Sequence, residues 1–277
     1  MADDINEVES LDNGTTEESK RRYLIRYILA KGGVCDERDL MGAFEALEGN
    51  NYQSDRAEDT LKDHIANINV KLNILGYKVV HCMGRLGMRC YVYIDIGSSD
   101  ETKLATKLKP DELTYLKWCL DKFLDSQKQL DTGNAPRTEV QVAVDSVLTE
   151  VTGQLDVQLP SAVTYTVGST ELSQFEELGP LESQQLLLKL CHLKWFYSTS
   201  QGRFGINVRG IQELKGYLKA RYELPICCSC HEIVLEGVQC TCLVKSWHIS
   251  CFRHYTTHVS MQCEGCGASI TQGIYLT

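Results

Sequence analysis

The pattern of cysteine and histidine over the last fifty residues constrains this chain more than any other feature. Residues 226–277 contain eight of the thirteen cysteines and four of the seven histidines. Eight of these side chains fall into four short pairs, separated by loops of unequal length. The pairs are Cys227 with Cys230, Cys240 with Cys242, His248 with Cys251, and Cys263 with Cys266.

Zinc prefers four thiolate or imidazole ligands in a tetrahedron, and a spacing of one or two residues lets both members of a pair reach one ion. Four such pairs are typical of a two-zinc cross-brace, in which alternate pairs share an ion. The spacing predicts one site from Cys227, Cys230, His248 and Cys251, and a second from Cys240, Cys242, Cys263 and Cys266. All coordination positions are then filled, so we expect two structural Zn²⁺ ions and no catalytic residue.

Some neighbouring residues leave alternatives open. Cys228 could replace Cys227, and His254 and His258, one helical turn apart, could in principle be ligands. We interpret both histidines, and His231, as bystanders. The remaining cysteines lie in expected helices and strands and are interpreted as packing residues; they are Cys35, Cys82, Cys90, Cys119 and Cys191.

Composition and net charge exclude several classes of protein. The first residues are acidic and carry no apolar signal segment, and no window reaches the roughly 20 apolar residues that span a bilayer. We therefore expect a cytosolic or nuclear protein without a membrane partner. Thiols stay reduced there, which favours metal binding over disulfides. A net charge of -9 argues against a free-standing nucleic-acid binder.

The first half is predicted to contain one helical domain that ends in a β-hairpin. Residues 1–19 are polar and acidic, so we expect disorder there. Order is expected from Lys20, with a first helix that ends at Gly32–Gly33. A second helix follows Asp36 as its N-cap, and a third runs from Ser54 to Gly76. Strands over 77–83 and 88–96 flank the turn sequence GRLG. Three helices and a hairpin are the order of a winged-helix domain, here 20–98.

The same order of elements returns over 108–222. Pro110 is suited to the first position of a helix, and 126–137 is expected to be a polar loop. Residues 139–151 fit a strand or a helix, and we favour a helix. A loop is expected over 152–170, helices over 171–178 and 181–193, a hairpin from 195–198 and 204–208, and a final helix over 209–222. The predicted fold class is α+β: tandem winged-helix domains followed by a C-terminal two-zinc cross-brace, RING-like (C4HC3) module at 225–270.

Two stretches carry a resemblance to a known family. The module CSCHEIVLEGVQC…WHISC…CEGC and the preceding WFYSTSQGRFGINVRGIQEL resemble the non-SMC element 1 family, over residues 20–270. Its members are subunits of the SMC five–six complex, which acts in DNA repair and chromosome maintenance. The resemblance implies a nuclear, chromosome-associated protein with a MAGE-type and a kleisin-like partner. It also implies RING-type E3 ubiquitin ligase activity on E2-ubiquitin, raised by the MAGE-type partner.

The surface on which a typical RING binds its E2 differs here. An apolar residue before the second ligand, a proline after the seventh and a cation after the eighth are replaced by Ser229, Glu264 and Gly267. With Phe252, these residues are the candidate E2 contacts.

Other functions remain open. The module could be a non-catalytic structural adaptor of the same complex. A PHD-like histone reader is less favoured, because Met261 stands where such fingers carry an aromatic residue. DNA, reached through the complex, or a partner protein could contact a basic stretch that contains Arg203, Arg209, Lys215, Lys219 and Arg221.

Overall fold

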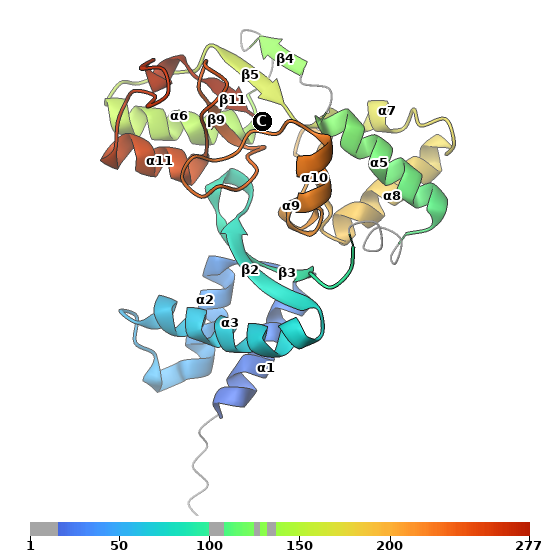
Figure 1. Ribbon diagram of the computed structural model, residues 1–277, viewed down its shortest axis with the longest axis vertical. Coiled ribbons are helices and arrows are strands. Elements are labelled where there is room, and N and C mark those ends of the chain that lie inside the picture. The colour runs from blue at the N-terminus through green and yellow to red at the C-terminus, as the bar shows by residue number, and fades with distance from the viewer. Residues whose placement is uncertain (1–15, 100–107, 125–127, 132–136) are drawn as a thin grey trace, which may run out of the picture.

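The structure is a computed structural model that describes residues 16–99, 108–124, 128–131 and 137–277. Figure 1 shows a helical unit at one end, the remaining elements at the other, and the β2–β3 hairpin reaching from the first to the second. In the described part of the chain, no helix is both long and apolar enough to cross a membrane.

The first unit is built on three helices, α1 (Glu17–Ala30), α2 (Glu37–Glu48) and α3 (Ala57–Ile74). Each helix buries one apolar stripe, and the shared core contains Leu24, Ile28, Leu40, Phe44, Leu61 and Ile65. A short 3-10 turn, Gly49–Asn51, follows α2. The helices themselves agree with the sequence periodicity.

Two of the helices begin at other residues than expected. The first helix begins at Glu17 and not at Lys20, because the Thr16 hydroxyl caps it by accepting from Ser19 N. The third helix begins at Ala57 and not at Ser54, after Arg56 at the N-cap position. Asp36 occupies the N-cap of α2 as expected, but its side chain makes no capping hydrogen bond. Disorder was expected over residues 1–19; this is wrong for 17–19, which belong to α1, and residues 1–15 lie outside the described residues.

The hairpin consists of β2 (Tyr77–Met83) and β3 (Arg89–Asp95), which confirms the strands expected on either side of GRLG. The strand β1 (Val34–Asp36) pairs with β3 and gives the order β1-β3-β2. The sequence did not predict β1, because three residues are too few to show a period.

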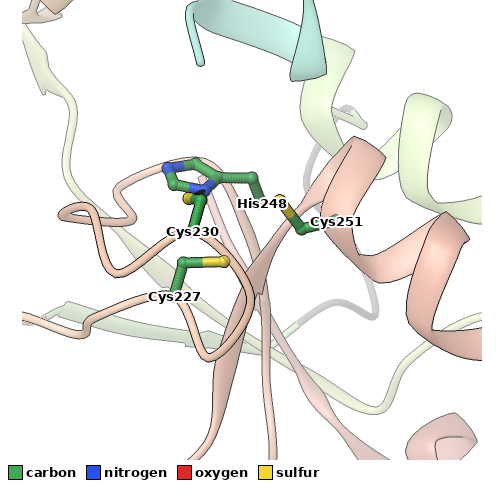
Figure 2. A group of neighbouring side chains, drawn as sticks. All are labelled: Cys227, Cys230, His248 and Cys251. Carbon is green, nitrogen blue, oxygen red and sulfur yellow. Dashed lines mark hydrogen bonds between the residues drawn. The ribbon is translucent and has the colours of Figure 1, made fainter. Parts of the chain in front are cut away.

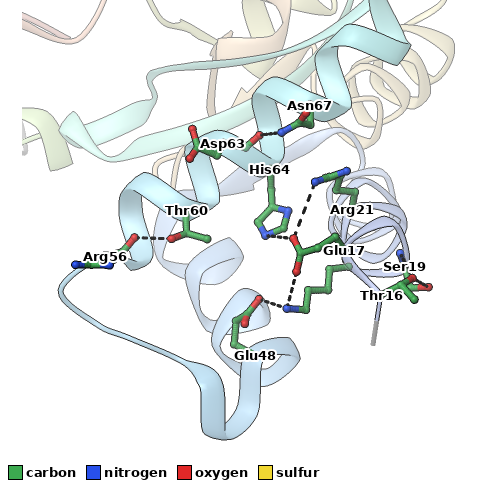
Figure 3. Close-up of polar contacts among 11 residues, drawn as sticks. Thr16, Glu17, Ser19, Arg21, Glu48, Arg56, Thr60, Asp63, His64 and Asn67 are labelled. Atoms are coloured by element: carbon green, nitrogen blue, oxygen red, sulfur yellow. Dashed lines mark hydrogen bonds and ion pairs between the residues drawn. The ribbon is translucent and has the colours of Figure 1, made fainter. Parts of the chain in front are cut away.

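A polar cluster ties the three helices together (Figure 3). Lys20 Nζ lies 2.7 Å from Glu48 and 3.0 Å from Glu17, and Glu17 is 3.6 Å from the buried His64 ring. The two carboxylates and the imidazole are close enough to suggest a metal site. The Lys20 ammonium already lies between the carboxylates, so this group is a salt-bridge cluster.

The second unit alternates helices with short strands. In chain order its elements are α5 (Pro110–Leu124), β4 (Lys128–Asp131), α6 (Glu139–Thr152), β5 (Ser161–Thr164), β6 (Val167–Gly168), α7 (Ser169–Leu172), α8 (Pro180–His192), β7 (Phe196–Ser198), β8 (Arg203–Ile206), α9 (Val208–Glu213) and α10 (Lys215–Arg221). The helix at Pro110, the helical choice for α6, the helix α8 and the β7–β8 hairpin confirm the sequence predictions. The strands β6, β8 and β7 form one antiparallel sheet.

Four predictions in this unit are wrong. The expected loops at 126–137 and 152–170 contain the strands β4, β5 and β6. The expected helix at 171–178 is reduced to α7, and the helix at 209–222 is broken into α9 and α10 at Leu214. The strands were missed because each has two to four residues and pairs with a segment far away in the chain.

One sheet joins the second unit to the C-terminal residues. Its order is β10-β9-β11-β5-β4, where β9 is Gly237–Gln239, β10 is Ser246–His248 and β11 is Ile274–Leu276. The strands β11 and β5 are parallel, with Ile274 opposite Ser161. Helix α11 (Ile249–His258) packs against α6 (Figure 1). The C-terminal module therefore shares its sheet and its core with residues 128–164. The limits 108–222 and 225–270 remain a prediction.

The tip of the β2–β3 hairpin, residues 84–88, contacts the C-terminal module. A 3-10 turn, Arg85–Gly87, presents Arg85 Nε 2.8 Å from the Glu236 carboxylate, and Leu86 N donates to the same carboxylate at 2.9 Å. Gly87 has φ +75° and packs so closely against Ser250 that a Cβ atom would lie 2.9 Å from Ser250 N.

Candidate metal centre

The first group of donors is Cys227, Cys230, His248 and Cys251, which lie close together although they come from two separate stretches of chain (Figure 2). All four ligand atoms lie within 4.8 Å of one another, and Cys230 Sγ is 3.3 Å from His248 Nδ1. Cys227, His248 and Cys251 are buried, so this group lies inside the module.

His248 is oriented for metal binding by a hydrogen bond on its other nitrogen. Nε2 lies 3.0 Å from the carbonyl oxygen of Ile233, which accepts from it when Nε2 carries the proton. Such a bond fixes the tautomer and leaves the Nδ1 lone pair directed at the cysteine sulfurs. The geometry is that of a histidine ligand with its supporting carbonyl.

The second group contains four cysteines, Cys240, Cys242, Cys263 and Cys266. Cys240 Sγ lies 3.5 Å from Cys266 Sγ, and Cys242 Sγ lies 4.0 Å from Cys263 Sγ. Four sulfurs around one zinc are separated by about 3.8 Å when each bond is about 2.3 Å. The donors of both groups therefore fit zinc, which would act there as a structural cross-link with no open position.

Three of the four pairs lie in turns of the same design. In each turn the residue after the second cysteine has a positive φ and donates its N–H to the carbonyl oxygen of the first. These residues are His231, Leu243 and Gly267, with N–O distances of 2.9, 2.9 and 2.8 Å. The Cys240-x-Cys242 pair is one residue shorter, yet it keeps this hydrogen bond.

Backbone amides in these turns stabilise thiolate, which is the form of cysteine that binds metal. A hydrogen bond from the backbone of Val244 lowers the pKa of Cys242 to about 7. Gly265 N likewise lies 3.4 Å from Cys263 Sγ.

The neighbours that could have been ligands lie outside both groups. Cys227 and not Cys228 joins the first group, and Cys228 N donates to Ser246 O. His254 and His258 lie on the exposed side of α11, with ring centres 4.8 Å apart and the ring planes tilted by 58°. His231 belongs to the turn that follows Cys227 and donates its backbone N–H to the Cys227 carbonyl oxygen.

The other cysteines are not all isolated. Cys35 and Cys119 are buried in the two main cores, and Cys191 packs at the edge of the larger one. Cys82 and Cys90 face each other across the hairpin at 3.9 Å, a pair that the sequence analysis missed.

The candidate E2 contacts separate into two kinds. Ser229, Glu264 and Gly267 are exposed. Phe252 is 0% exposed and packs in the core, so its prediction as a surface contact is wrong. It lies on the inner face of α11, beside Trp247 at 6.2 Å between ring centres. The positive φ of Gly267 gives a backbone reason for glycine at the position where a typical RING carries a cation.

The basic stretch is not a free cationic surface. Arg209 pairs with Glu213 and donates to Gly32 O and Leu193 O, which links the two units. Arg203 donates to Thr166, Lys215 pairs with Glu232 at 2.7 Å, and Arg221 pairs with Asp121 at 3.0 Å. Of the five, only Lys219 has neither an ion pair nor a side-chain hydrogen bond with a residue in the described ranges. Four of the five candidates thus serve intramolecular contacts, which argues against phosphate binding by this stretch.

These features define an α+β protein with two C-terminal donor groups. The first group consists of three cysteines and a histidine, the second consists of four cysteines, and together they suit a two-zinc module. Comparisons with known proteins agree. A model of the family described as Nse1 non-SMC component of SMC5-6 complex matches residues 21–214. The chain belongs to this family.

Similar proteins span nearly the whole chain. The Saccharomyces cerevisiae protein named non-structural maintenance of chromosomes element 1 is 34% identical, over 97% of this chain and 98% of its own length. The Homo sapiens homologue is 24% identical over 91% and 84%. A chain in the solved structure of an Nse1-Nse3-Nse4 complex shares the fold, with a TM-score of 0.63, 17% identity and coverage of 97% and 98%.

Proposed function

We propose that this protein is a RING-type E3 ubiquitin ligase subunit of an SMC5-6 complex, in which two structural zinc ions shape a surface for E2-ubiquitin. The observation that carries the proposal is the alternation of the ligand pairs. The first and third pairs form one group of donors, and the second and fourth form the other. This cross-brace places the 227–231 turn, helix α11 and the 263–267 turn on one module.

The partners and the location follow from the family. The solved relative belongs to an Nse1-Nse3-Nse4 complex, which supports assembly of this chain with a MAGE-type and a kleisin-like subunit. We place the protein in the nucleus on chromosomes, acting in DNA repair, with DNA contacted through the complex. The tandem winged helices at 20–98 and 108–222 would be the docking platform.

In this mechanism the protein takes no part in covalent chemistry. A RING module binds a ubiquitin-charged E2 and orients its thioester for attack by a lysine, so its effect is one of position. The residues of this chain that would meet the E2 are exposed and polar, Ser229 and Glu264. They offer less apolar contact than a typical RING, which is why we expect activity to depend on the MAGE-type partner.

The polar character of the expected E2 surface also favours a second candidate, a non-catalytic adaptor. The module shares a sheet with β5 and β4, so zinc could serve only to hold an assembly surface. A PHD-like reader is not supported. The aromatic side chains of Trp247, Phe252 and Tyr255 are 1%, 0% and 6% exposed, so none of them lines an open cage for methyl-lysine.

Discharge of ubiquitin from a panel of charged E2 enzymes separates the two candidates. The assay compares the wild-type chain in complex with its MAGE-type partner against E2 alone. The proposal predicts faster discharge, and a further increase of several-fold in Ser229→Ile, which restores an apolar contact at an exposed position. Thr241→Ile is the matched control, because Thr241 is an exposed middle residue of another ligand pair. An intact, zinc-loaded complex that never exceeds E2 alone, with or without Ser229→Ile, would establish the adaptor.

A further inference from the structure

Two cysteines outside the zinc module face each other across the β2–β3 hairpin. Cys82 and Cys90 are directly opposed in the antiparallel register, and their sulfur atoms lie 3.9 Å apart. Directly opposed residues of antiparallel strands have Cα atoms about 4.5–5.5 Å apart, within the range of about 4.4–6.8 Å that disulfides span. Side-chain rotation is therefore enough to close the sulfur–sulfur gap to about 2.05 Å, without a shift of either strand.

The two sulfurs differ in their access to solvent. Cys82 is half-buried and lies in the wall of an open hollow of about 430 Å³, with Lys62, Lys78 and Lys215 around it. Cys90 is only 1% exposed. A small oxidant can thus reach Cys82 first and leave Cys90 as the second thiol.

In the reduced protein Cys82 is held in its thiol form. The hydrogen bond with Cys90, together with burial, raises the pKa of Cys82. Oxidation proceeds through the thiolate, so the raised pKa slows the reaction of Cys82 and keeps the pair reduced until an oxidant accumulates.

We propose that Cys82 and Cys90 form a reversible disulfide that clamps the hairpin when the protein meets hydrogen peroxide. The Cys82 thiol gives up its proton and the sulfur attacks the peroxide; a sulfur–oxygen bond forms, the oxygen–oxygen bond breaks, and the departing hydroxide takes up that proton and leaves as water. The Cys90 sulfur then attacks the sulfenic acid of Cys82, and its proton leaves with the hydroxyl group as a second water. Two thiols lose two electrons, the peroxide gains them, and a dithiol reductant reverses the change.

The position of the pair gives the disulfide a structural consequence. It closes the base of the hairpin tip, whose Arg85 and Leu86 bind Glu236 of the zinc module. Cys90 also packs in a small cluster with Val92, Ile94 and Val208 of α9, at the contact between the two units. Oxidation would hold the tip in the shape that fits the zinc module.

Peptide mapping tests the disulfide directly, because trypsin cuts between the two cysteines. Cleavage after Lys78, Arg85 and Arg89 leaves Cys82 in the peptide 79–85 and Cys90 in a peptide that begins at residue 90. The full-length, zinc-loaded chain is treated with hydrogen peroxide, alkylated and digested without reductant. We expect the two peptides to be linked, with a mass two hydrogens below their sum, and to separate on treatment with dithiothreitol.

Variants identify the residues. Cys82→Ser should abolish the linked peptide, with Cys82→Val as a second variant that keeps an apolar side chain in the hairpin. Cys191→Ser, a change to a cysteine at the edge of the other core, should leave the link intact. The proposal is overturned if Cys82 and Cys90 remain alkylatable at a dose that already modifies Cys191. It is also overturned if Cys82 links to a cysteine of the zinc module.

A second readout addresses the clamp. Native trypsin should cut at Arg85 and Arg89 at least several-fold more slowly in the oxidised protein than in the reduced one, with zinc content unchanged. Equal cleavage rates in the two forms would show that the disulfide does not clamp the tip.

Discussion

Arg85 Nε and the Glu236 carboxylate lie 2.8 Å apart, and this ion pair joins the hairpin of the first unit to the zinc module, 151 residues away. The Arg85 side chain is 28% exposed and that of Glu236 is 10% exposed. The guanidinium also stacks on the Tyr197 ring, 3.9 Å from its centre. Three segments of the chain therefore meet at one arginine.

The pair should be strongly coupled. Arg85→Ala leaves a nearly buried carboxylate without its cation, and we expect a loss of about 2–3 kcal/mol in the free energy of unfolding. A double-mutant cycle with Glu236→Ala should give a coupling of about 1–2 kcal/mol. The matched control is Arg22 with Glu18, an exposed pair at 2.8 Å, where solvent screening should leave a much smaller coupling. Equal coupling in the two pairs would contradict the role given to Arg85.

Gly87 should tolerate no side chain. Its φ of +75° is unfavourable for other residues, and a Cβ atom would lie 2.9 Å from Ser250 N. Gly87→Ala should lower the thermal midpoint by roughly 4–10 °C, since strain and overpacking add. Gly153→Ala provides the comparison, because Gly153 has φ +67° but open space around it. That change should cost about 2–4 °C. If the two glycines respond equally, the hairpin tip does not pack on α11 as described.

His64 should make the first unit sensitive to mild acid. Burial lowers the pKa of His64 below its usual 6.5, against the opposing effect of Glu17, with Arg21, Glu48 and Lys20 also facing the ring. Above pH 6.5 the imidazole is neutral in both the folded and the unfolded chain, so its contribution to stability is fully present. As the pH falls below 6.5 the unfolded chain binds the proton first, and stability decreases until the pH passes the lower pKa of the folded state.

The measurement is the unfolding midpoint between pH 7.5 and 5.5 for the wild type and for His64→Gln, which cannot titrate. The wild type should lose more stability over this range than the variant. Parallel curves would mean that His64 does not titrate differently in the two states. Zinc loss through His248 affects both proteins equally and cancels in the comparison.

The two zinc sites should differ in their resistance to chelators. Cys227 and Cys251 of the first group are 0% and 8% exposed, whereas Cys266 of the second group is exposed. A coloured chelator should therefore remove one ion several-fold faster than the other, and Cys266→Ser should abolish the fast phase. Loss of both ions in a single phase from the wild type would contradict the difference in burial.

Local signals were enough for the longer helices and for the donor groups. The apolar stripes of α2 and α5 repeat over whole turns, and ligand pairs such as Cys263 and Cys266 are set by chain spacing alone. Both kinds of pattern are complete within a few residues, so the sequence predicts them.

Contacts between distant segments could not be predicted in the same way. The strand β11 has three residues and pairs with β5 more than a hundred residues earlier. Nothing in GRLG indicates that Arg85 binds Glu236, and nothing near Phe252 shows which side of α11 is buried. In these cases tertiary packing decides the structure, and periodicity carries no information about it.

Native mass spectrometry of the full chain tests most directly whether the eight residues of the two donor groups hold two zinc ions in a cross-brace. The wild type should carry two ions per chain, Cys230→Ser and Cys266→Ser one each, and Cys228→Ser two. Cys228 is the sharpest control, because it lies between Cys227 and Cys230 and outside both donor groups. A single zinc ion in the wild type, or loss of an ion in Cys228→Ser, would contradict the assignment.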